Sequence, residues 1–141
     1  MNLINKTILL MINYFSKYKF VFYLCNFTLI FLYLFPGSVL GWILYDDLSL
    51  QPQITKDFII STNHFYAFII LSFIGILTFC KSNQFVYISF YLIFLSLGLE
   101  LLHYFIPDRS FEFSDLFGNL LGVFVVIILF YFFKKNENFK I

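Results

Sequence analysis

Long apolar runs alternate with short polar connectors along most of the chain. The runs cover residues 20–45, 58–80, 85–106 and 116–133. Each is close to the roughly 20 residues that a helix needs to cross a hydrocarbon core of about 30 Å. None alternates apolar with polar positions, so the pattern predicts helices rather than barrel strands. The connectors are short, and we therefore expect consecutive helices to pack antiparallel in one compact bundle.

The first run contains the sequence Pro36-Gly37-Ser38. Proline removes a backbone donor and clashes with the preceding helical turn. At 1.5 Å per residue, an unbroken helix over residues 20–45 would also overshoot the hydrocarbon core. We therefore expect the helix to kink or stop at Pro36, with residues 39–45 continuing at an angle or lying at the interface.

The first 19 residues have a different pattern. Their apolar residues recur at near-helical spacing, with polar residues between them: Ile4, Ile8, Met11, Ile12 and Phe15 against Lys6, Asn13 and Lys17. This favours an amphipathic helix on a membrane surface over a signal peptide, because no Ala-x-Ala-like site follows. The predicted fold is an all-α membrane protein: an interfacial segment 1–19, a compact bundle of four transmembrane helices over 20–133, and a tail 134–141.

Composition supports this class of protein. Hydrophobic residues make up 61% of the 141 residues and charged residues only 12%, whereas soluble domains are about a quarter charged. The lipid bilayer is thus the first expected partner. The lysines form no basic cluster, so we expect no nucleic-acid partner. Cys25 and Cys80 lie in apolar runs without metal-type spacing and are interpreted as buried hydrophobes.

Lysine placement predicts the orientation. The N-terminal segment, the connector at 81–84 and the C-terminal tail contain Lys6, Lys17, Lys19, Lys81, Lys134, Lys135 and Lys140. The two other connectors contain only Lys56 and Arg109. The positive-inside rule then places both termini in the cytoplasm and the acidic connectors outside.

With this orientation, polar residues from three predicted helices reach one level in the outer half of the membrane. Glu100 and His103 lie near the outer end of the third helix, where they and Tyr104 would share a face. His64 lies about two turns inside the second helix. Asp115 and Asn119 lie one turn apart on the fourth, with Ser114 or Asp115 as its N-cap. Ionisable groups cost about 2.5–3.5 kcal/mol at the centre of a span, so this convergence indicates a site.

A structural interpretation of the same residues stays open. Glu100 could form a compensating ion pair with Arg109, and Asn119 could hydrogen-bond a neighbouring helix. Gly118 and Gly122 form a GxxxG face that favours close approach of another helix or of a partner membrane protein. A metal site from His64, His103, Glu100 and Asp115 is possible because the residue types fit, but it needs both histidines on the same side of the cleft. We assign no metal ligand, and the cofactor stays open.

One family resemblance covers roughly residues 20–133. His64-Phe65-Tyr66 with Phe68, then Glu100, then Pro107-Asp108-Arg109, then Asp115-Leu116-Phe117-Gly118-Asn119 with Gly122, resembles the VanZ-like family. That family commonly has Asp-Lys where this chain has Ile60 and Ser61, and glutamine where it has His103. The resemblance implies a small protein of the bacterial inner membrane. Some relatives reduce susceptibility to glycopeptide antibiotics such as teicoplanin.

Two classes of function follow from these residues. In the first, a pocket in the outer leaflet binds or acts on the head group of an envelope lipid or glycan. Its candidate catalytic residues are His64, Glu100, His103 and Asp115, and its candidate substrate-binding residues are Arg109, Asp108 and Asn119. In the second, the chain is a non-catalytic accessory or scaffold subunit of a membrane complex. A transporter or channel is a weaker option, because the chain has few spans and no internal repeat.

Overall fold

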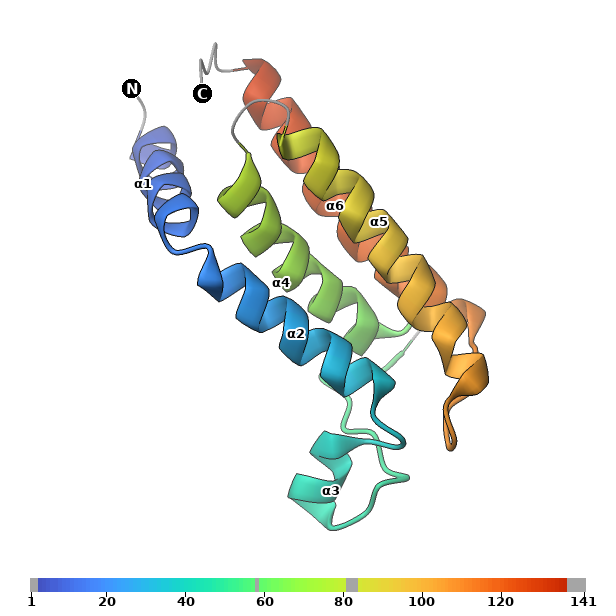
Figure 1. The fold of residues 1–141 in the computed structure, drawn as a ribbon. Helices are drawn as coiled ribbons and strands as arrows, with labels where there is room; N and C mark the ends of the chain where they lie inside the picture. The colour runs from blue at the N-terminus through green and yellow to red at the C-terminus, as the bar shows by residue number, and fades with distance from the viewer. Residues whose placement is uncertain (1–2, 58, 81–83, 137–141) are drawn as a thin grey trace.

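The computed structural model describes residues 3–57, 59–80 and 84–136, and all regular structure in these ranges is helical. Helix α4 lies between α2 on one side and α5 with α6 on the other (Figure 1). The loop end of the bundle, defined by residues 35–57, 59–61 and 103–112, is opposite the end where α1 lies and α6 finishes (Figure 1). The elements are α1 (Leu3–Lys17), α2 (Phe20–Leu34), α3 (Val39–Tyr45), α4 (Thr62–Phe79), α5 (Gln84–Leu102), the 3-10 turn η1 (His103–Phe105) and α6 (Phe113–Asn136).

Three of these helices are long and apolar enough to cross a membrane: α4, α5 with its 3-10 extension, and α6. The fifteen residues of α2 would span only about 22 Å at 1.5 Å per residue. Helices α1 and α2 pass the same test together, but the chain bends by 77° between them. The described residues therefore supply three candidate spans, or four if the bent pair counts as one, where the sequence predicted four.

The expected break at Pro36 is confirmed. Helix α2 ends at Leu34, and Gly37 adopts a left-handed conformation with φ of 80°. Helix α3 begins two residues later, where the Ser38 side chain accepts a hydrogen bond from the Gly41 backbone N–H at 2.9 Å. The seven residues of α3 lie apart from the bundle at its loop end (Figure 1).

Helix α1 has the predicted amphipathic pattern. Ile12 is only 1% exposed, and Ile8, Met11 and Phe15 pack against the core around it. Lys6 and Lys17 are exposed. The apolar stripe of α1 therefore contacts the bundle itself, chiefly α4. The side chain of Ile4 lies outside the described residues.

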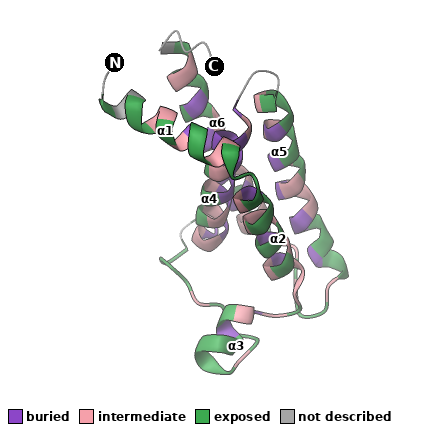
Figure 2. Cartoon of the chain, turned by 60° about the vertical axis from the view of Figure 1, so that its left-hand side comes forward, coloured by how far each residue is buried: buried purple, intermediate pink, exposed green. Residues whose placement is uncertain are grey.

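The surface of the bundle is apolar, and several polar side chains are buried beside the apolar core. Large apolar side chains cover the outer faces of the helices, as Phe27, Phe94 and Leu129 illustrate at 65–69% exposure. The interior includes Glu100 and Asn119, both 0% exposed. Figure 2 shows the buried positions on the inner faces of the long helices and exposed positions outside. Such a surface suits hydrocarbon surroundings, because soluble monomers rarely expose large apolar patches.

Helices α4 and α6 form the closest pair, and two glycines of α6 allow it. A Cβ atom on Gly118 would lie 2.6 Å from the Ser61 carbonyl oxygen, and one on Gly122 would lie 2.6 Å from that of Phe65. The predicted close approach at the GxxxG face is confirmed. The neighbour is α4 of the same chain, so this face is covered and does not offer the partner surface that we expected at Gly118 and Gly122.

Gly122→Ala tests this packing, with Gly98→Ala as its matched control. The added methyl at Gly122 must displace backbone of α4, and overpacking of this kind costs about 1–3 kcal/mol. At Gly98 no heavy atom lies within 4 Å of the added Cβ, so that variant should unfold at or slightly above the wild-type temperature. Thermal unfolding in detergent, followed by circular dichroism, measures both. Equal melting temperatures for the two variants would contradict the role of Gly122.

Candidate functional site

Polar side chains from five elements of the bundle meet near its loop end. We call them the polar cluster: Tyr33 of α2, His64 of α4, Glu100 of α5, His103 of η1, and Asp115 and Asn119 of α6. The sequence predicted that His64, Glu100, His103, Asp115 and Asn119 would converge, and the structure brings all of them together.

Glu100 connects the members of the polar cluster. Its Oε1 accepts a hydrogen bond from the Glu112 backbone N–H at 3.1 Å and lies 3.4 Å from His103 Nδ1. Its Oε2 accepts from Asn119 Nδ2 at 3.5 Å and lies 3.9 Å from His64 Nδ1. The carboxylate thus contacts groups from α4, η1, α6 and the connector before α6. This density of partners is what a fully buried carboxylate needs.

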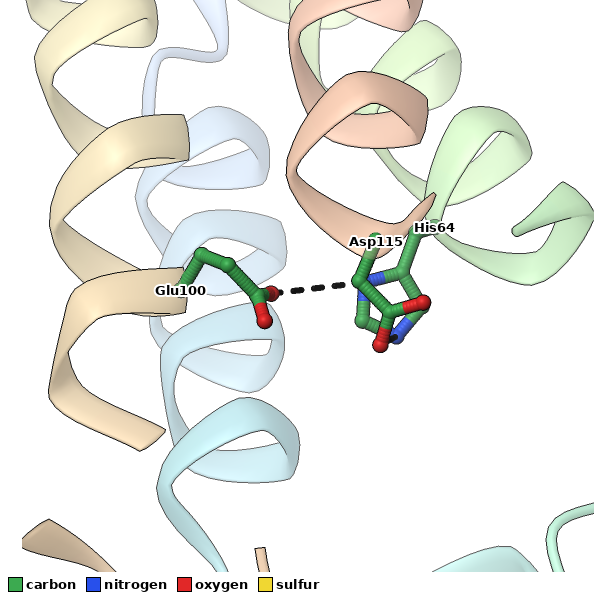
Figure 3. Close-up of side chains that lie close together, drawn as sticks. All are labelled: His64, Glu100 and Asp115. Atoms are coloured by element: carbon green, nitrogen blue, oxygen red, sulfur yellow. Dashed lines mark ion pairs between the residues drawn. The ribbon is translucent and has the colours of Figure 1, made fainter. Parts of the chain in front are cut away.

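His64 lies between two carboxylates. Its Nε2 is 3.4 Å from Asp115 Oδ2, on the side opposite the contact between Nδ1 and Glu100. Figure 3 shows the imidazole beside Asp115, with the Glu100 carboxylate facing both. His64 is 5% exposed, and its Nδ1 has no hydrogen-bond partner within the described residues.

The start of α4 places His64 closer to the helix end than we expected. The Asp57 carboxylate accepts hydrogen bonds from the Thr62 backbone N–H at 2.8 Å and from the Thr62 hydroxyl at 3.0 Å. This satisfies an otherwise unpaired donor of the first turn, and α4 begins at Thr62. His64 therefore lies in the first turn and not two turns inside; Phe58, the predicted start, is outside the described residues.

The predicted common face of Glu100, His103 and Tyr104 is wrong for Tyr104. The α-helix gives way to a 3-10 turn at His103, and residues three apart eclipse each other in 3-10 geometry. His103 Nδ1 lies 3.4 Å from Glu100 Oε1, and its Nε2 lies 3.1 Å from the Tyr33 carbonyl oxygen. Tyr104 turns outward, is 66% exposed, and stacks on Phe111 with ring centroids 5.0 Å apart.

Helix α6 begins at Phe113, three residues before the predicted start at Leu116. The Glu112 carbonyl accepts from the backbone N–H groups of Asp115 and Leu116. Asp115 is therefore inside the first turn rather than at the N-cap, where its negative charge is favoured by the helix dipole. Asp115 and Asn119 do share one face, as predicted, and both reach the polar cluster.

Tyr33 belongs to the polar cluster but was missed from the sequence. Its hydroxyl donates to Asn119 Oδ1 at 2.7 Å, which leaves the Asn119 amide nitrogen directed at Glu100. Its ring contacts those of both histidines, with the His64 centroid 4.9 Å away and the His103 centroid 5.9 Å away. The chain has ten tyrosines, most of them in apolar runs like this one, so nothing in the sequence distinguishes Tyr33.

Arg109 reaches the end of α2 instead of a carboxylate. Its Nε donates to the Phe35 carbonyl at 3.2 Å, and its Nη2 donates to the carbonyls of Leu32 and Gly37 at 3.1 and 2.7 Å. Within the described residues it forms no ion pair with Glu100, so the compensating pair considered from the sequence is not formed. Burial lowers the pKa of Arg109, an effect that the charges of Asp115 and Glu100 oppose.

Asp108 does not join the polar cluster. It is exposed and holds a left-handed backbone conformation with φ of 59°. It lines a second hollow at the loop end together with Arg109 and Asp47, and Arg109 also lines the pocket beside His64. Asp108 could therefore contact a substrate only if the substrate reached that hollow.

A pocket of about 340 Å³ adjoins the polar cluster. His64, His103 and Arg109 line it, and so do apolar residues such as Leu32 and Ile70. Its volume lies within the usual range for small-molecule sites, about 300–1,000 Å³. An imidazole beside a carboxylate can donate or accept a proton, so the arrangement can bind a polar group or transfer a proton to it. Comparisons of the chain with protein-family models, curated proteins and solved structures found no match.

Arg109→Ala should destabilise the protein, because three carbonyl oxygens at the end of α2 would lose their donor. These hydrogen bonds are part-buried and have a charged donor, and a hydrogen bond with a charged group contributes about 1.5–3 kcal/mol. Lys56→Ala removes a positive charge from an exposed position at the same end and should have almost no effect. Thermal unfolding in detergent compares the two. An Arg109→Ala variant that melts with Lys56→Ala would show that the three hydrogen bonds contribute little.

Proposed function

We propose that the chain is a VanZ-like, multi-pass protein of the bacterial inner membrane whose pocket binds the anionic head group of an envelope lipid or glycan from the outer leaflet. The observation that carries this proposal is the composition of the pocket wall. One part presents His64, His103 and Arg109, and the other presents Leu32 and Ile70. A cavity with a polar part and an apolar part, at the end of an apolar bundle, suits an amphipathic molecule.

Arg109 supports an anionic head group. Its Nε and Nη2 donate to carbonyls of the α2 end. The N–H groups on Nη1 form no hydrogen bond within the described residues, although the side chain lines the pocket. Those donors can hold a phosphate or carboxylate oxygen, and the fixed position of the guanidinium lowers the entropy lost on binding.

His64, Glu100, His103 and Asp115 remain the candidates for any reaction on the bound group. Each histidine has a carboxylate oxygen 3.4 Å from a ring nitrogen. Such a pair can orient an imidazole for proton transfer, and His64 and His103 both line the pocket. The alternative, an accessory or scaffold subunit, needs no ligand in this pocket, so ligand binding distinguishes the two.

The orientation rests on the lysines. Lys17, Lys19, Lys134 and Lys135 all belong to the helix ends opposite the loop end (Figure 1); Lys81 and Lys140 lie outside the described residues. The loop end contains Asp46, Asp47, Asp57, Asp108 and Glu112. This asymmetry favours an outward-facing loop end, and with it a pocket on the outer side of the membrane.

Cysteine labelling in cells tests the orientation. Thr55→Cys at the exposed loop end should react with a membrane-impermeant maleimide in intact cells. Lys6→Cys, exposed on α1, should react only after the membrane is permeabilised. Labelling in the reverse pattern would place the pocket on the cytoplasmic side.

Ile70→Trp tests the pocket itself, with Ile128→Trp as control. Both isoleucines are more than a third exposed, at 59% and 50%, but only Ile70 lines the pocket. Native mass spectrometry should detect phosphatidylglycerol or a polyprenyl phosphate on the wild type in preference to diacylglycerol. Ile70→Trp should weaken that binding about tenfold, which corresponds to about 1.4 kcal/mol. Absence of a preference in the wild type, or equal binding by both variants, would favour the scaffold function.

A further inference from the structure

Three residues of the polar cluster form a set of metal-type donors. His64 offers a ring nitrogen, and Glu100 and Asp115 each offer a carboxylate oxygen, and these atoms all lie within 4.8 Å of one another. Zn²⁺ binds nitrogen and oxygen ligands at about 2.0–2.2 Å, so ligand atoms around one ion are about 3.4 Å apart in tetrahedral geometry. Small side-chain rotations would bring the three donors to that spacing. Figure 3 shows the residues converging from α4, α5 and α6.

His64 supplies an independent indication of a ligand. It is 5% exposed, yet its Nδ1 has no hydrogen-bond partner within the described residues. The contact of that nitrogen with Glu100 Oε2, at 3.9 Å, is too long for a hydrogen bond. Buried polar atoms in proteins are almost always paired, and an unpaired one often marks the place of a bound water molecule or ion. A cation between the imidazole and the two carboxylates would pair it.

The charges of the site also favour a cation. Glu100 is fully buried and Asp115 is only partly exposed, and uncompensated carboxylates are costly at such positions. Arg109 donates to carbonyls of the α2 end and, within the described residues, pairs with neither carboxylate. The remaining sources of positive charge are protons on the two histidines or one divalent cation. A cation bound at His64 Nδ1 also satisfies that unpaired nitrogen.

The Glu100 carboxylate is oriented by two hydrogen bonds. The Glu112 backbone N–H donates to Glu100 Oε1 at 3.1 Å. Asn119, itself oriented by the Tyr33 hydroxyl, donates to Glu100 Oε2 at 3.5 Å. Metal ligands are typically fixed by outer hydrogen bonds of this kind.

We propose that His64, Glu100 and Asp115 together bind one divalent transition-metal ion of the Zn²⁺ or Mn²⁺ type. Imidazole suits zinc and iron, whereas carboxylates suit manganese and magnesium. One imidazole with two carboxylates therefore suits an ion that accepts both nitrogen and oxygen ligands, such as Zn²⁺ or Mn²⁺. Three protein ligands leave further coordination positions. Because His64 lines the pocket, a water molecule or an anionic group in the pocket can occupy one of them.

Metal binding by the purified, tag-free protein in detergent tests the proposal without any lipid ligand. After EDTA treatment and its removal, calorimetric titration with Zn²⁺ should show one ion per chain, and Mn²⁺ should give a bound electron paramagnetic resonance signal. Asp115→Asn should weaken Zn²⁺ binding more than about 100-fold, because losing an outer partner alone costs about 10- to 100-fold. Glu100→Gln should do the same.

Asp46→Asn is the matched control, at a loop-end residue whose backbone is left-handed with φ of 54°. It removes the same charge from an exposed residue of the loop end, and asparagine tolerates the left-handed conformation found there. It should bind Zn²⁺ like the wild type. Folding is checked by thermal unfolding in EDTA; if Glu100→Gln does not fold, the partly exposed Asp115 still provides the comparison. A wild type that binds neither ion, or equal Zn²⁺ affinity in Asp115→Asn and Asp46→Asn, would overturn the metal site while leaving the lipid proposal to its own test.

Discussion

The burial of the Glu100 carboxylate in an apolar bundle is the constraint on which the loop end depends. A charge at 0% exposure needs partners from every direction, because the surrounding side chains cannot replace water. Those partners come from α4, η1, α6 and the connector at Glu112. Helices that are distant in sequence must therefore meet at one level. The need to pair the Glu100 carboxylate therefore determines where most residues of the polar cluster lie.

The broken helix at Pro36 imposes a second constraint at the same end. Helix α2 stops at Leu34 and leaves carbonyl oxygens without helical donors. Arg109, from the turn that follows η1, donates to three carbonyls at this break. The same interaction draws the α5–α6 connector towards α2 and keeps the Arg109 side chain in the pocket wall. Arg109 therefore has two roles: it pairs the carbonyl oxygens left free where α2 ends, and it gives the pocket its positive charge.

The sequence predicted the helices and the convergence well, because both follow from hydrophobic pattern and from the cost of burying charge. His64, Glu100, Asp115 and Asn119 meet as expected. The misplacements lie where a side chain or a local turn overrides periodicity. Asp57 pairs the first turn of α4, which begins at Thr62 rather than at Phe58. The 3-10 turn at His103 directs Tyr104 away from Glu100. Tyr33 was not foreseeable, because only tertiary packing separates it from the other tyrosines.

Gly118 affects both the packing of α4 against α6 and the position of the candidate site residues. Gly118 lies between Asp115 and Asn119 along α6, and a Cβ there would meet the Ser61 carbonyl oxygen at 2.6 Å and His64 Cβ at 3.4 Å. Its missing side chain therefore sets how closely His64 approaches Asp115. A larger residue would separate the helices and lengthen the 3.4 Å contact between the imidazole and the carboxylate. The GxxxG face that first suggested association with another protein instead sets the spacing of the donors within this chain.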